Sequence, residues 1–130
     1  MNDKERFEEL ESILDDIDAF DGCVIVEGKK DIRALKALGL DLDLLCVQRD
    51  GGPLRMAEIL SERGTEAMIL TDWDDKGNIL ADELEHHLSN SCIRYDSETR
   101  KRLRDICIKD IKDVESLDSL YVRLKDLYQQ

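Results

Sequence analysis

Three short apolar runs, each followed by a loop rich in charge and glycine, most constrain how this chain can fold. The runs are residues 23–26, 44–47 and 67–70. Wholly apolar runs of this length are typical of strands buried on both faces, as in a parallel sheet. A helical pattern follows each run, so strand and helix alternate with short connections. That alternation predicts an α/β fold with a mainly parallel sheet of about four strands and helices on both faces.

The segments that flank this core are predicted to be mostly helical. Residues 3–18 carry apolar side chains at a spacing of three and four, which predicts an amphipathic helix. Residues 91–95 are expected to form a short edge strand, and residues 97–129 closing helices. With 130 residues and no linker, repeat or low-complexity segment, the chain is expected to be one domain with its core at residues 22–95.

The net charge of −12 limits the partners that the surface can attract. A surface this acidic repels nucleic acid at long range, so a nucleic-acid function needs a local basic patch, a metal ion or a basic protein partner. Arg100, Lys101, Arg102 and Arg104 form the most basic segment. They can contact a nucleic-acid backbone, but a solvated helix face is the favoured interpretation.

The cysteines and the hydropathy pattern bear on location. Four cysteines are present without a CxxC pair, and we expect them to be small buried side chains in a reducing compartment. The first residues lack an apolar signal core, and no apolar run approaches the ~20 residues that span a bilayer. The expectation is a cytoplasmic protein without a membrane segment.

The candidate site lies in the loops that follow the apolar runs, because ligands of an open parallel sheet bind beyond the carboxyl ends of its strands. Glu27 directly follows the first run, and Asp72 follows the third by two residues. Asp72 and Asp74 are two residues apart, which places both on one side of an extended segment. If the first and third strands are neighbours, all three carboxylates face one point.

Carboxylates gathered in this way repel one another unless a cation joins them. A hard divalent ion with oxygen ligands is the natural choice, with Mg²⁺ as the default and Mn²⁺ as the alternative. Such an ion also binds and polarises a substrate phosphate. The competing interpretation is that these acids only cap helices and turns, and we favour that interpretation for Asp31 and Asp75.

The segment VIVEGKKD, followed further along the chain by ILTDWDDKG, resembles the two motifs of the Toprim domain. That domain occurs in topoisomerases, bacterial-type primases, OLD-family nucleases, recombination proteins and ribonuclease M5. The resemblance implies a Rossmann-like Toprim fold with Glu27, Asp72 and Asp74 as metal ligands. EGK is the form found in ribonuclease M5-like members, which implies that Lys29 is in the active site. Small stand-alone Toprim proteins of archaea are similar over nearly the whole length.

The chain departs from two branches of that family. Topoisomerases carry a third acid where this chain has Lys76, and they need a large clamp that 130 residues do not supply. Primases add zinc-binding and helicase-docking parts. The resemblance therefore implies Mg²⁺-dependent phosphodiester chemistry on RNA or DNA, as in ribonuclease M5 or a related nuclease. The alternative is a non-catalytic module that binds nucleic acid or a nucleotide within a larger complex.

Further residues of the same loops have two interpretations each. Lys30, Arg49, Gly51 and Gly52 are candidate phosphate contacts, since adjacent glycines let a backbone approach a phosphate before the helix that follows. An ordinary turn and a solvated lysine explain them equally well. Trp73 either stacks on a base or covers its loop against the fold.

Overall fold

Four strands form one parallel sheet in the order β2-β1-β3-β4 in the computed structural model, which describes residues 1–128. The strands are β1 (Cys23–Val26), β2 (Asp43–Cys46), β3 (Ala67–Ile69) and β4 (Tyr95–Asp96). Val24 of the central strand β1 is in register with Leu44 of β2 and Met68 of β3. The predicted α/β fold, of Rossmann-like type, is confirmed, and all of its strand pairs are parallel.

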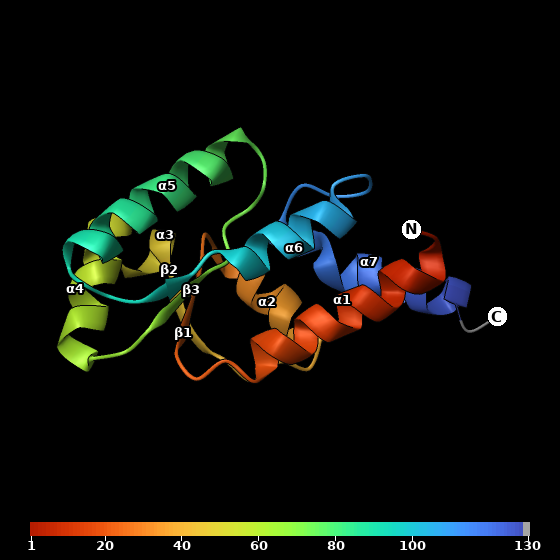
Figure 1. Cartoon of the computed structure of the whole chain (residues 1–130), viewed down its shortest axis with the longest axis horizontal. Helices are drawn as coiled ribbons and strands as arrows, with labels where there is room; N and C mark the ends of the chain where they lie inside the picture. The colour runs from red at the N-terminus through yellow and green to blue at the C-terminus, as the bar shows by residue number, and fades with distance from the viewer. Residues whose placement is uncertain (129–130) are drawn as a thin grey trace.

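Helices cover both faces of this sheet (Figure 1). They are α1 (Asp3–Asp18), α2 (Lys29–Ala37), α3 (Val47–Asp50), α4 (Pro53–Arg63), α5 (Asp75–Asn90), α6 (Glu98–Cys107) and α7 (Leu117–Tyr128), and the 3-10 turn η1 (Val114–Ser116) precedes α7. Helices α4 and α5 pack on one face, and α1, α2, α6 and α7 pack on the other. None of the helices described is long and apolar enough to cross a membrane.

The two faces of the sheet carry separate hydrophobic cores because successive strand residues point to opposite sides. Val24 and Val26 of β1 belong to the core under α1, α6 and α7, whereas Ile25 belongs to the core under α4 and α5. All four residues of β1 are buried. This double burial explains why the strand sequence is apolar throughout.

The structure differs from the sequence-based expectation at several boundaries. Residue 47 does not extend the second strand but begins the short helix α3, where the Asp50 carboxylate accepts the Cys46 N–H at 2.8 Å. Strand β4 begins only at Tyr95, and Cys92 before it is exposed with a φ of 56°, so the expectation that all four cysteines are buried is wrong for Cys92. Residue 129, the expected end of the closing helices, lies outside the described residues.

Candidate metal centre

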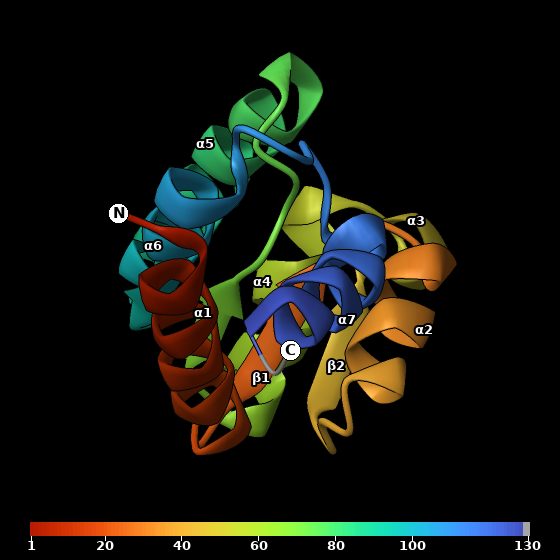
Figure 2. The same cartoon turned by 90° about the vertical axis from the view of Figure 1, so that its right-hand side faces the viewer.

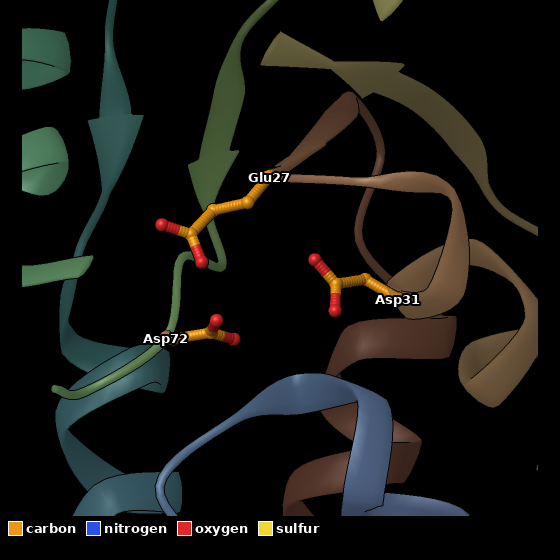
Figure 3. Close-up of side chains that lie close together, drawn as sticks. All are labelled: Glu27, Asp31 and Asp72. Atoms are coloured by element: carbon orange, nitrogen blue, oxygen red, sulfur yellow. The ribbon is translucent and has the colours of Figure 1, made fainter. Parts of the chain in front are cut away.

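Three carboxylates meet at the carboxyl ends of β1 and β3, which are neighbours in the sheet. Glu27 directly follows β1, Asp72 lies in the loop after β3, and Asp31 lies in the first turn of α2. Each offers one oxygen atom, and these oxygens all lie within 4.8 Å of one another. Figure 3 shows the three side chains pointing toward a common centre. We call this group the acidic cluster.

The least satisfied atom of the acidic cluster is Oε1 of Glu27. Glu27 is only 7% exposed, and this oxygen is buried without a hydrogen-bond partner among the described residues. Burying a carboxylate oxygen without a partner is costly, so native proteins nearly always pair such atoms. A cation bound by the Glu27 carboxylate would offset this cost. The residues therefore fit a divalent ion with oxygen ligands.

Burial also disfavours ionisation of the two aspartates. Loss of hydration, followed by the neighbouring Glu27 carboxylate, raises the pKa of Asp72 to about 8. Loss of hydration raises the pKa of Asp31 to about 6, against the opposing hydrogen bond from the Gly28 N–H. Without a cation the cluster thus retains protons near neutral pH, and a bound cation would displace them.

Asp31 has both the capping role expected from the sequence and a place in the acidic cluster. Its Oδ2 accepts the Gly28 N–H at 3.1 Å, which closes the start of α2. The third position of a helix directs such a side chain back toward the preceding strand end. Its spacing of four residues from Glu27 was the signal that could have identified it as a third ligand.

The structure places Asp74 outside the acidic cluster. The chain bends at residues 73–74, and Asp74 is not among the carboxylates whose oxygens lie within 4.8 Å of one another. Asp74 is the N-cap of α5, and its Oδ1 accepts the Gly77 N–H at 2.7 Å. It still lines the same cleft as Glu27 and Asp72. Two of the three predicted ligands therefore come together, and the third lies nearby.

A buried arginine holds the loop that carries Asp72. Arg100 of α6 is 7% exposed, and its Nε donates to the Thr71 carbonyl at 3.0 Å. Its Nη2 donates to the Asp72 carbonyl at 2.5 Å and to Oδ1 of Asn78 at 2.6 Å. The expectation of a solvated helix face is therefore wrong for Arg100. This side chain fixes the main chain on both sides of the Asp72 peptide.

The Asp72 side chain is held as well. Its Oδ1 accepts the Val114 N–H at 2.8 Å, which ties the loop after β3 to the turn η1. The Trp73 indole is buried and donates to the Ile111 carbonyl at 2.8 Å. Trp73 thus covers its loop against the fold and is not available to stack on a base. These contacts leave Asp72 little freedom to turn away from Glu27.

Unpaired cations surround the acidic cluster. Lys29, Lys30, Arg33 and Lys76 line a cleft of about 540 Å³ together with the three acids. Of the ion pairs formed between residues 1–128, none involves these four side chains. The predicted site residues Lys29 and Lys30 are therefore at the cleft, with positive charge free to meet an anion.

The other predicted phosphate contacts lie elsewhere. Arg49 is bound to the Asp50 carboxylate at 2.8 Å, and neither it nor Gly51 or Gly52 lines the cleft. The basic residues of α6 are likewise engaged within the protein. Arg102 pairs with Glu9 and Asp16, Arg104 with Asp105, and Lys101 with Glu98.

Comparison with known proteins shows the family of this chain. No family model matches it. A solved structure, a putative protein from Aquifex aeolicus, has a TM-score of 0.63 at 20% identity over 86% of this chain and 94% of that one, which supports the fold. The UPF0292 protein of Thermococcus sibiricus is 37% identical over 95% of this chain and 96% of its own length. That of Methanosarcina acetivorans is 39% identical over 93% and 83%. The chain therefore belongs to the UPF0292 family.

Proposed function

We propose that this protein carries out Mg²⁺-dependent phosphodiester chemistry on nucleic acid, as a nuclease similar to ribonuclease M5. The observation that carries the proposal is the acidic cluster at the ends of two adjacent parallel strands, in which the Glu27 carboxylate also has a buried, unpartnered Oε1. Carboxylate oxygens in such a group are ligands for a hard divalent ion. The proposal also follows the resemblance of the EGKKD and DWDDKG segments to Toprim motifs.

In this proposal the acidic cluster holds the ion, with Mn²⁺ able to replace Mg²⁺. When bound, the ion supplies Lewis-acid polarisation of a phosphoryl oxygen and stabilises the leaving oxygen. Glu27 is a metal ligand or a general base. Lys29, exposed at the start of α2 and in the cleft, counters the negative charge on the phosphoryl group. Asp74 remains a candidate ligand through the resemblance and its place in the cleft.

The direct test is hydrolysis of structured RNA and of single-stranded DNA with Mg²⁺. Asp72→Asn removes one charge of the acidic cluster, and we expect a loss of roughly a hundredfold or more in rate. Asp75→Asn is the matched control, because Asp75 is exposed in the first turn of α5 and does not line the cleft. Equal hydrolysis rates for the wild type and Asp72→Asn would contradict the proposed activity.

A second candidate function is a non-catalytic module that binds nucleic acid or a nucleotide within a larger complex. The net charge of −12 and the internal pairing of the cations on α6 favour it, because both weaken the attraction of the surface for nucleic acid. A basic protein partner would then supply the electrostatic attraction for nucleic acid that this acidic surface lacks. Copurification with such a partner, together with binding but no turnover by the isolated chain, would distinguish this function from the first.

We also infer a cytoplasmic location. The four cysteines are free, and three of them are buried. Free thiols of this kind persist in reducing compartments.

A further inference from the structure

A second cavity adjoins the cleft of the acidic cluster. Its volume is about 650 Å³, and it opens between α2 and the segment formed by η1 and α7. These elements lie side by side, as Figure 2 shows. The two cavities share Lys30, Arg33 and Glu115 as lining residues. A ligand seated over the acidic cluster can therefore continue past Lys30 and Arg33 into the second cavity.

The shared cations lie on one face of α2. Lys30 and Arg33 are three residues apart, and Ala37, one turn further on, also lines the second cavity. This spacing places the three side chains along one side of the helix. Lys30 and Arg33 are both exposed. Their positive ends are thus available along the passage from one cavity to the other.

Lys30 and Arg33 form no ion pair within residues 1–128, unlike Arg123, which lines the second cavity from α7. Arg123 of α7 donates to the Asp110 carboxylate at 2.8 Å. Lys30 and Arg33 beside the passage attract an anionic chain in a protein of net charge −12, although Glu115 and Asp118 also line the second cavity. Ser116 and Ser119 add hydroxyl groups to the lining, which can bond phosphate or sugar oxygens.

We propose that the second cavity is a subsite for the stretch of nucleic-acid strand next to the phosphodiester held at the acidic cluster. Lys30 and Arg33 contact its backbone phosphates, and η1 and α7 form the opposite wall. This inference rests on the proposed function and adds a substrate class to it. The preferred substrate is a strand of several nucleotides that fills both cavities, and a dinucleotide fills only the first.

The test compares a dinucleotide with a longer single strand of the same sequence in Mg²⁺. The quantity measured is the ratio of kcat/KM for the strand to kcat/KM for the dinucleotide. We expect Arg33→Ala to lower this ratio by roughly tenfold, mainly through a higher KM for the strand. Lys36→Ala is the matched control, because Lys36 is an exposed, unpaired cation on the same helix and lines neither cavity. Its ratio should equal that of the wild type.

The possible outcomes separate the two claims. If the wild type is active and the kcat/KM ratio is equal in Arg33→Ala and Lys36→Ala, the subsite is contradicted but the proposed chemistry is not. A wild type that neither cleaves nor binds either substrate overturns the proposed function and the subsite with it. If the protein binds without turnover, the same ratio is taken from Kd values measured by fluorescence anisotropy in Mg²⁺, and the same comparison decides the subsite.

Discussion

The aspartates of the acidic cluster hold protons more tightly in the folded protein than in the unfolded chain. Burial raises the pKa of Asp72 to about 8 and that of Asp31 to about 6, whereas an unfolded aspartate titrates near ~3.9. Between these values the native state binds more protons than the unfolded state. The free energy of unfolding therefore falls as the pH rises through this range when no cation is present.

This linkage predicts a pH-dependent effect of the cation on stability. In EDTA, the wild-type Tm should fall more between about pH 5 and about pH 8 than the Tm of Asp72→Asn, whose amide does not titrate. Mg²⁺ should raise the wild-type Tm more at the higher pH, because fewer protons must then be displaced. Thermal melts at both pH values measure this. Parallel curves for the two proteins in EDTA would contradict the raised pKa of Asp72.

Gly77 permits the tight turn that carries Asp72. A Cβ at this position would lie 1.9 Å from the Asp72 carbonyl oxygen, which is main chain and cannot move aside easily. We expect Gly77→Ala to lower the free energy of unfolding by about 3 kcal/mol. Gly64→Ala is the control, because Gly64 has a φ of +66° but open space around it, so only about 1 kcal/mol should be lost. Urea denaturation compares the two, and similar losses would contradict this description of the turn.

At the scale of elements, helix α6 supports the site without contributing a ligand. Arg100 bonds the Thr71 and Asp72 carbonyls and the Asn78 side chain, so α6 holds the loop between β3 and α5 in place. Lysine keeps the charge but cannot reproduce the planar set of donors. We expect Arg100→Lys to weaken Mn²⁺ binding by roughly tenfold and to lower stability.

The control for this prediction is Arg104→Lys on the same helix, because Arg104 pairs only with its neighbour Asp105 near the surface. Calorimetric titration of each variant with Mn²⁺ measures the affinity, and urea denaturation measures the stability. If Arg100→Lys loses stability but binds Mn²⁺ as the wild type does, Arg100 supports the fold alone.

Elements with a complete local pattern were predictable from the sequence. Helix α1 has the predicted bounds of 3–18, and β1 those of 23–26, because an apolar face or a doubly buried strand is visible in the residue types alone. Helix α3 and the bounds of strand β4 were not predictable in this way, although a short edge strand was expected at residues 91–95. A hydrogen bond from the Cys46 N–H to the Asp50 carboxylate starts α3, and pairing with β3 creates β4 over only two residues.

The site was predictable in outline because its position depends on topology. Glu27 and Asp72 come together because β1 and β3 are neighbours, which was the condition of the prediction from sequence. Asp31 was assigned only a local capping role, although its spacing of four residues from Glu27 was a signal for a third ligand. The roles of Arg100 and Trp73 depend on tertiary contacts with distant segments.

At the scale of the whole molecule, the net charge is −12, and a strand placed over the acidic cluster would meet the cations that line the cleft. Four cations line the cleft, and each phosphate neutralised on a single strand contributes ~0.7 to the salt dependence. The slope of log Kd against log salt for a single strand should therefore be at most about 3. EDTA should abolish binding, since the bare acidic cluster repels phosphate. A much steeper slope, or binding unaffected by EDTA, would contradict this arrangement.

The central claim is that Glu27, Asp31 and Asp72 hold one divalent cation between the ends of β1 and β3. Calorimetric titration of the metal-free protein with Mn²⁺ tests it most directly, in the wild type, Asp72→Asn and Asp75→Asn. The account predicts saturable binding in the wild type and in Asp75→Asn, and affinity lower by at least roughly tenfold in Asp72→Asn. Absence of saturable binding in the wild type, or equal affinity in Asp72→Asn, would contradict it.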